Sequence, residues 1–129
     1  MSVYSYTYSS AYSPAAPVVD VIVYSPGSPE NNVGLSLLLD SGADVTVLPV
    51  RVLNRIDAEY LETAILYGVA GGRTRVDVYR VALQLGPHTV NAVHVVGVLS
   101  TSNIVLGRDV LNQLSVTLNG PANMTEIEG

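Results

Sequence analysis

The sequence predicts an all-β domain, and three observations support this prediction. Short runs of valine, isoleucine, leucine and tyrosine recur along the chain, and these residue types favour strands. Turn-forming glycine and proline separate the runs, as at residues 25–29 and 86–87. Apolar residues make up 48% of the 129 residues and charged residues only 13%, a balance typical of one folded domain with a sizeable core.

The first strong strand signal is Val18–Tyr24, which stops at the proline- and glycine-rich turn of residues 25–29. Residues 35–39 are apolar except for Ser36 and suit a strand that is buried on both faces. The last two strands would pair as a hairpin across Asn119 and Gly120. These last two strands are predicted at residues 116–118 and 124–127, and other strands are predicted at residues 45–47, 64–67, 74–81, 81–85, 90–98 and 104–106.

Two segments have the spacing of a helix. Residues 108–114 are predicted to form one short C-terminal helix, because Val110, Leu111 and Leu114 fall on one side. Residues 50–56 are compatible with one or two helical turns. The remainder of the chain shows no repeat of fixed period, so the fold class is mostly β.

The first seventeen residues differ in composition from the rest. Tyr4, Tyr6 and Tyr8 alternate with serine or threonine, and two prolines close the segment. This alternation fits an edge strand, and the composition equally fits a flexible tail. We interpret residues 1–17 as a Tyr/Ser/Pro-rich N-terminal tail and residues 18–129 as the folded domain.

Missing residue types exclude several chemistries. The absence of cysteine excludes disulfides, thiol nucleophiles and thiolate zinc sites, and the absence of lysine excludes a Schiff base. His88 and His94 lie six residues apart with no carboxylate cluster near them, so we expect neither a metal nor a cofactor. Carboxylates remain as the residues for hydrolytic chemistry.

Charge and hydropathy indicate which classes of partner the chain is expected to bind. The net charge is −5 and the six basic residues are arginines without a continuous stripe, so nucleic-acid binding is not expected. No apolar run has the length of a membrane span, so no membrane partner is expected. The N-terminus lacks the basic and apolar regions of a signal peptide, and a cytoplasmic location is therefore the default expectation.

The tripeptide Asp40-Ser41-Gly42 is the strongest functional signal in the chain. It places a carboxylate directly after the apolar residues 35–39. Burying a carboxylate beside hydrocarbon costs free energy unless another group pairs with it, which favours a reacting group. Asp40 could instead be a turn residue that caps its own backbone, because Asp, Ser and Gly are all common in turns.

Three separated segments together resemble the retropepsins, the single-domain aspartic proteases of retroviruses and their relatives. They are the Asp-Ser-Gly turn, the glycine-rich hairpin tip at residues 68–72, and the Gly-Arg-Asp sequence within residues 104–111. The resemblance covers about residues 18–120. It implies a closed or partly open acid-protease barrel of short strands, with a flap hairpin, that works as a homodimer.

The resemblance also implies roles for the residues of the turn. Asp40 would be the catalytic acid and base, and Ser41 would hydrogen-bond across the dimer and brace the two active-site turns. Gly42 would let a peptide approach the backbone closely, and its carbonyl would accept a hydrogen bond from that peptide. Ala43 would keep the floor of the cleft small.

Residues outside the turn receive supporting or binding roles from the same resemblance. Asp44 would meet the peptide backbone and pair with Arg108 of the same subunit, and Gly107 would lie beneath the catalytic turn. Val47 and Val105 would line side-chain pockets, although valines in strands are core residues by default. The flap would comprise Gly68, Val69, Ala70, Gly71 and Gly72.

The mechanism explains why a single motif matters. Aspartic proteolysis needs two carboxylates around one water, and this chain contains only one Asp-Ser-Gly. The resemblance therefore implies a homodimer with Asp40 from each subunit at a two-fold axis, where two close carboxylates share one proton. We expect an endopeptidase that cuts extended peptide or protein substrates without a cofactor.

The sequence leaves two alternatives open. The same fold could be a catalytically silent dimer that binds peptides or organises an assembly, or a β-rich dimerisation domain without a ligand. Val45 stands where many retroviral members have an acid, so the specificity of those members does not carry over.

Overall fold

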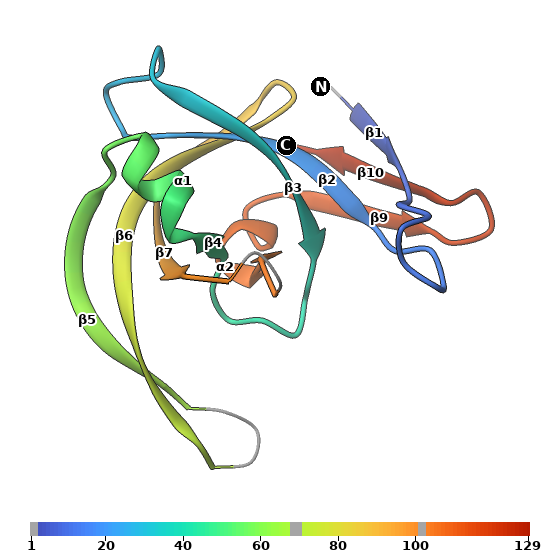
Figure 1. The fold of residues 1–129 in the computed structure, drawn as a ribbon. Helices are drawn as coiled ribbons and strands as arrows, with labels where there is room; N and C mark the ends of the chain where they lie inside the picture. Colours follow the sequence, from blue (N-terminus) through green and yellow to red (C-terminus); the bar gives the residue numbers. More distant parts are fainter. Residues whose placement is uncertain (1–2, 68–70, 101–102) are drawn as a thin grey trace.

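The computed structural model describes residues 3–67, 71–100 and 103–129, and these form two β-sheets (Figure 1). The smaller sheet has the strand order β1-β10-β9, and the larger has the order β2-β3-β8-β4-β7-β6-β5. Strand β2 also pairs with β6, so the larger sheet curves back on itself and closes into a barrel. The strands are β1 (Val3–Thr7), β2 (Val18–Tyr24), β3 (Asn32–Leu39), β4 (Val47–Pro49), β5 (Glu59–Tyr67), β6 (Arg73–Leu85), β7 (His88–Val98), β8 (Val105–Leu106), β9 (Ser115–Asn119) and β10 (Met124–Glu128).

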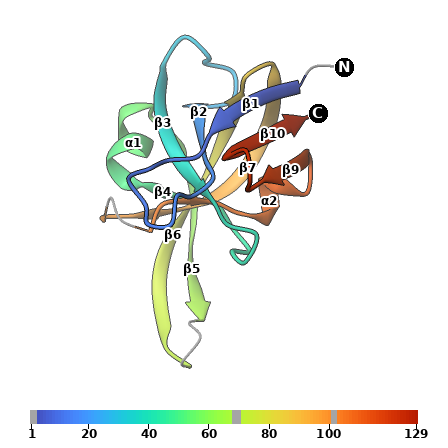
Figure 2. The ribbon, with the colours of Figure 1, turned by 90° about the vertical axis from the view of Figure 1, so that its right-hand side faces the viewer.

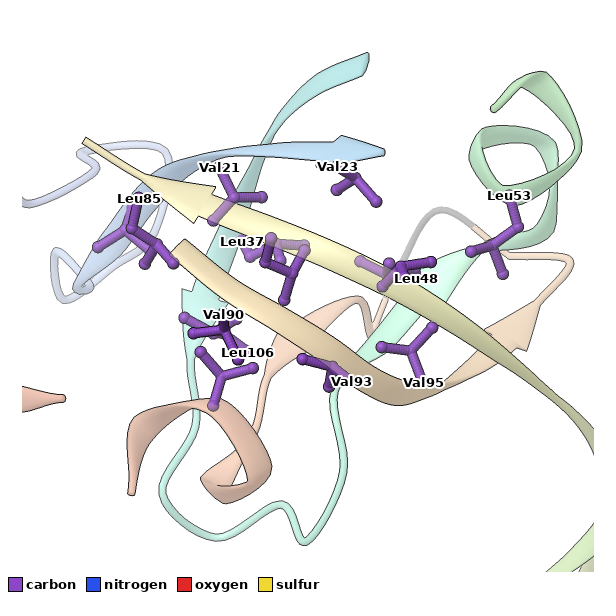
Figure 3. Close-up of a cluster of buried hydrophobic side chains, with 14 of the residues drawn as sticks. Val21, Val23, Leu37, Leu48, Leu53, Leu85, Val90, Val93, Val95 and Leu106 are labelled. Atoms are coloured by element: carbon purple, nitrogen blue, oxygen red, sulfur yellow. The ribbon is translucent and has the colours of Figure 1, made fainter. Parts of the chain in front are cut away.

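The interior of the barrel is aliphatic. Along β2, the buried side chains of Val19, Val21 and Val23 alternate with the exposed side chains of Asp20 and Ile22, as a strand with one face in a core requires. Figure 3 shows side chains from several strands converging on this interior. The largest fully buried side chains include Leu37, Leu48, Leu53, Ile56, Leu83, Leu85, Leu106 and Ile127.

Two short helices accompany the sheets: the C-terminal one that was expected, and one within residues 50–56, where the sequence is compatible with helical turns. Helix α1 (Val50–Arg55) begins directly after Pro49 and buries Val52 and Leu53. Helix α2 (Arg108–Leu111) follows β8 and is shorter than its spacing predicts. In the described part of the chain, no helix has the length and hydrophobicity needed to cross a membrane.

Strand β8 lies between β3 and β4, the two strands that flank the loop of residues 40–46. It pairs in parallel with β3, with Leu39 opposite Leu106, and it meets β4 where Val47 lies opposite Val105. The loop of residues 40–46 leaves β3 and enters β4, so it passes next to the end of β8. The chain segment after β8 therefore lies beside this loop.

The first strand differs from the tail interpretation of residues 1–17. Val3–Thr7 form β1 and pair antiparallel with β10 over their whole length. The edge-strand alternative therefore describes these residues, because β10 offers unpaired backbone groups and the core offers an apolar surface on which Tyr6 packs.

The strand expected at residues 45–47 begins later in the structure. Strand β4 covers Val47–Pro49, and Val45 and Thr46 belong to the preceding loop. The N–H of Thr46 donates to the carboxylate of Asp109 at 3.0 Å instead of joining a strand neighbour. A side-chain acceptor thus takes the N–H of Thr46, while its carbonyl still accepts from the N–H of Val96 in β7 at 3.0 Å.

Strands β5 and β6 form the long hairpin that the glycine-rich segment predicts. They pair from Glu59 opposite Arg80 to Tyr67 opposite Arg73, with an irregularity between Tyr60 and Glu62. In both views the hairpin projects beyond the rest of the molecule (Figures 1 and 2). The end of β5 and the beginning of β6 therefore lie away from the barrel.

Candidate active site

Asp40 occupies the first position after β3 and is half-buried. Its N–H donates to the carbonyl of Leu106 at 3.0 Å, so β8 fixes the position of its backbone. Its Oδ1 accepts from the N–H of Gly42 at 2.9 Å, and its own carbonyl accepts from the N–H of Ala43 at 3.1 Å. The carboxylate is held in a tight turn, and no described residue donates a hydrogen bond to its Oδ2.

The backbone of the turn is open to solvent. Ser41 and Gly42 are exposed, and a side chain on Gly42 would place its Cβ 3.1 Å from Oδ1 of Asp40. A larger residue at position 42 would therefore crowd the carboxylate that this turn presents. An exposed backbone next to a fixed carboxylate allows an extended peptide to approach the acid closely.

Arg108 ties the loop together at three successive points. Its Nη1 donates to the carbonyl of Ser41 at 2.6 Å, and its Nη2 donates to the carboxylate of Asp44. Its backbone N–H donates to the carbonyl of Ala43 at 2.9 Å. The planar fork of a guanidinium can serve two acceptors at fixed angles, which orients the loop more firmly than a single charge would.

Gly107 lies against the floor of the same loop. A Cβ at this position would come within 2.6 Å of both the carbonyl carbon and the carbonyl oxygen of Val45. Real Cβ atoms do not approach backbone so closely, so the loop can take this path only over a glycine. The close packing of Gly107 against Val45 and the hydrogen bonds of Arg108 together position residues 41–45.

Thr46 and Asp109 form a buried hydrogen-bond network that sequence reasoning did not single out. The side chain of Thr46 is fully buried, and its hydroxyl donates to Oδ1 of Asp109 at 2.7 Å while accepting from the N–H of Gly107 at 3.0 Å. Asp109 also accepts from the N–H of Thr46 and from the N–H of Val110 at 2.9 Å. Only two features of the sequence pointed to this network. Thr46 is a polar residue between two valines, and Asp109 is an acid that follows Gly107 and Arg108.

Val47 and Val105 lie opposite each other where β4 meets β8. Val47 is half-buried and Val105 is 9% exposed, so both belong largely to the barrel wall within one chain. Their pocket-lining roles remain a prediction.

The described part of the flap reaches the glycine-rich tip from both sides. Gly71 and Gly72 are exposed, and Gly71 has a φ of +79°, a conformation that other L-residues adopt only with strain. Gly68, Val69 and Ala70 lie outside the described residues, so the structure gives no position for the other three predicted tip residues.

Among the described residues, Asp40 itself lines no hollow of the single chain. One hollow of about 530 Å³ lies between β1 and the outer faces of β2 and β3, and another of about 500 Å³ lies where β6 meets the end of β7. A smaller one of about 300 Å³ is lined by Leu39 and Ser41, the two sequence neighbours of Asp40. Among the described residues, no three His, Asp or Glu side chains gather as they would around a metal ion.

Comparison with known proteins found a matching sequence family and solved structures with a similar fold. A family described as gag-polyprotein putative aspartyl protease matches residues 30–113, which include the turn, the hairpin and the Gly-Arg-Asp segment. No curated protein sequence matches the chain significantly.

Two solved structures share the fold. EIAV protease, solved with the inhibitor HBY-793, superposes with a TM-score of 0.60 at 24% identity, over 76% of this chain and 86% of that one. A retropepsin-like aspartic protease from Rickettsia conorii superposes with a TM-score of 0.67 at 15% identity, over 98% of this chain and 91% of that one. At these identities the superpositions establish the architecture of the chain.

Proposed function

The chain belongs to the gag-polyprotein aspartyl protease family, and from this premise we propose that it is a homodimeric endopeptidase. One observation carries the proposal: the chain holds one Asp-Ser-Gly on an exposed turn, where the carboxylate of Asp40 accepts from the N–H of Gly42 and the backbone N–H of Asp40 donates to the carbonyl of Leu106. Peptide hydrolysis of this type needs two carboxylates, so the second must come from another copy.

In the proposed reaction, the two Asp40 carboxylates flank one water molecule. One carboxylate takes a proton from the water as its oxygen attacks the scissile carbonyl, and the protonated partner donates its proton to the carbonyl oxygen. The tetrahedral diol then collapses: the first carboxylate passes its proton to the amide nitrogen and the C–N bond breaks. A hydroxyl of the diol returns its proton to the second carboxylate, so the amine and the carboxylic acid leave and the dyad again holds one proton. The pair carries one shared proton, so cleavage should favour mildly acidic conditions.

The substrate would lie as an extended strand between the flap and the active-site loop. Main-chain groups of Gly42 and Asp44 would bind its backbone, and Val47 and Val105 would contact its side chains. Ser41 would contact the partner's turn, and closure of the flap, which includes Gly71, would exclude water. The 500 Å³ hollow beside β6 and the 94% exposed Leu99 offer additional apolar surface next to the flap.

Replacement of Asp40 by Asn tests the catalytic assignment. The variant keeps the shape of the side chain and should fold and dimerise normally, but it should not cleave an unstructured protein such as casein across the acidic to neutral range. Asp57→Asn is the matched control, because it removes the same charge from an exposed loop after α1. Undiminished cleavage by the Asp40 variant would refute the assignment, and wild-type binding without turnover would favour the silent module.

A mixing experiment tests whether the site is shared. If each active centre needs two acids, equal amounts of wild-type and Asp40→Asn chains that exchange freely leave only about a quarter of the dimers intact. Activity should then fall to about a quarter of that of the same total of wild-type chains, whereas independent sites would retain about half. Activity per chain should also fall on dilution as subunits separate.

A further inference from the structure

The hollow of about 530 Å³ on the outer surface of the barrel is a groove with an aromatic wall and an acidic floor. Tyr4 and Tyr6 of β1 form the wall, and Asp20, Ile22, Gly34 and Ser36 of β2 and β3 contribute to the floor. No residue of the active-site loop 40–46 lines this tyrosine groove. The proposed reaction therefore leaves the groove without a role.

The register of two strands builds the floor. Asp20 lies opposite Ser36, and Ile22 lies opposite Gly34, where β2 pairs with β3. These four residues alternate with more buried neighbours, so they occupy the outer face of the sheet. A Cβ added to Gly34 would meet only the carbonyl oxygen of Val21, at 3.9 Å. The space above Gly34 is therefore open to a ligand.

The two tyrosine rings are held in place by the rest of the fold. They project from the same face of β1, with ring centroids 6.4 Å apart and an interplanar angle of 49°. The ring of Tyr4 lies against Gly86, where an added Cβ would collide with it. Tyr6 packs against the hydrophobic core. The wall is consequently formed before any ligand binds.

Asp20 gives the groove its charge. The hydroxyl of Ser36 donates to Oδ1 of Asp20 at 2.6 Å and so orients the carboxylate. No described residue donates to Oδ2, and the ion pairs of the described chain involve other acids. Burial, and then the charge of Asp20, raise the pKa of Tyr6, which places this charge beside the aromatic wall. A carboxylate without a cationic partner thus faces two electron-rich rings.

We propose that the tyrosine groove binds an arginine side chain of a partner protein, at a site separate from the candidate active site. The guanidinium would donate to Oδ2 of Asp20 and lie against the rings of Tyr4 and Tyr6. The methylene stem would cover Ile22, which is 38% exposed, and occupy the space above Gly34. This inference does not depend on the proposed endopeptidase activity.

Charge and shape favour arginine over other ligands. Asp20 alone is charged among the described residues that line the groove, and the chain has a net charge of −5, so a cation is attracted. A guanidinium is planar, stacks on aromatic rings and is less strongly hydrated than an ammonium, so it loses less than lysine on entering an aromatic groove. A neutral aliphatic group would leave the carboxylate covered and without a partner.

NMR titration of the ¹⁵N-labelled protein with an acetylated and amidated Gly-Arg-Gly peptide tests the proposal. Backbone signals of residues 20–22 and 34–36 should shift in a saturable manner, and those of residues 41–45 should not. The same peptide with citrulline, which keeps the shape of arginine without its charge, should bind at least about tenfold more weakly. The lysine peptide should bind about threefold more weakly, because it lacks the stacking of the planar group.

Two variants locate the binding site. Asp20→Asn removes the charge and keeps the side-chain shape, and Gly34→Val fills the open space on the floor. Each should weaken binding of the arginine peptide at least about tenfold. Asp57→Asn, in an exposed loop, and Gly120→Val, where an added Cβ would meet nothing within 4 Å, are the matched controls. Both controls should bind as the wild type does, and circular dichroism should show that the variants are folded.

These outcomes are independent of cleavage. Equal affinity for the arginine and citrulline peptides, an absence of saturable shifts in the groove, or full binding by folded Asp20→Asn would each overturn the site. Lysine binding as tight as arginine binding would overturn the assignment to arginine. If the peptide binds in the groove while the protein cleaves no substrate, the groove is correct and the endopeptidase assignment fails. If the protein cleaves but the groove signals do not shift, the reverse holds.

Discussion

Asp109 holds Thr46 at two points, accepting from its hydroxyl at 2.7 Å and from its backbone N–H at 3.0 Å. The same hydroxyl accepts from the N–H of Gly107 at 3.0 Å. The beginning of α2 and the end of the loop 40–46 are thereby joined by a buried network. Arg108 joins the same two segments on their exposed side, so the loop that carries Asp40 is fixed from both sides.

The first prediction concerns this network. Thr46→Val keeps the side-chain volume but leaves the N–H of Gly107 without a partner in the interior, so we expect a loss of about 1–3 kcal/mol in the free energy of unfolding. Thr46→Ser retains the hydroxyl and should lose less than the valine variant. Urea denaturation measures both, and equal stability of Thr46→Val and wild type would show that the network does not hold the loop.

The second prediction concerns the space above Gly107. Its φ of −93° is accessible to any L-residue, so only the 2.6 Å approach to the carbonyl of Val45 opposes a larger side chain. Gly107→Ala should lower the free energy of unfolding by about 1–3 kcal/mol and displace the active-site loop. Gly120→Ala is the matched control, because its Cβ would meet nothing within 4 Å. A Gly107→Ala protein as stable as the control would contradict the steric explanation.

Elements whose pairing partners are close in sequence could be predicted well. The bounds of β2 match the sequence prediction, because alternation and a following proline-glycine turn define both ends. The β5–β6 and β9–β10 hairpins likewise follow from apolar runs on either side of turn residues. In each case the signal lies within one continuous stretch of chain.

Contacts between distant segments could not be predicted in the same way. Strand β8 has only two residues, too few to show a period. Its parallel register with β3 could not be predicted, because it depends on contacts between distant residues such as the hydrogen bond from Asp40 to Leu106. Thr46 lies between two valines, and this local sequence predicts a strand residue. The neighbouring residues do not indicate that the distant Asp109 accepts the hydrogen bonds of Thr46. The alternation of Tyr4 with serine fits both a strand and a tail. The segment is a strand in the structure because it pairs with β10.

The third prediction concerns stability at high pH. Burial, together with the charge of Asp20 and the nearby Tyr4, raises the pKa of Tyr6 above its usual value. The folded state therefore holds this proton more tightly than the unfolded chain. Its contribution to stability is complete below the unfolded pKa of about 10 and is lost as the pH rises through the folded pKa.

In denaturation curves from about pH 8 to about pH 11, Tyr6→Phe should therefore lose less stability with rising pH than the wild type. Burial, followed by Asp77 and Tyr60, also raises the pKa of Tyr79, so the double variant Tyr6→Phe/Tyr79→Phe should flatten the curve further. Identical slopes for the wild type and the double variant would contradict this linkage.

The last prediction separates orientation of the active-site loop from stability of the fold. Arg108 bridges the carbonyl of Ser41 and the carboxylate of Asp44, and lysine cannot serve both acceptors with one planar group. The ion pair is exposed, with 41% of the arginine and 82% of the aspartate side chain accessible, so Arg108→Lys should cost less than about 1 kcal/mol of stability. A loop displaced by a fraction of an ångström should nevertheless lower kcat/KM by about ten- to a hundredfold. Arg55→Lys, on the exposed end of α1, should change neither quantity. If Arg108→Lys instead lowers stability and activity in proportion, the arginine supports the fold as a whole and does not orient the loop.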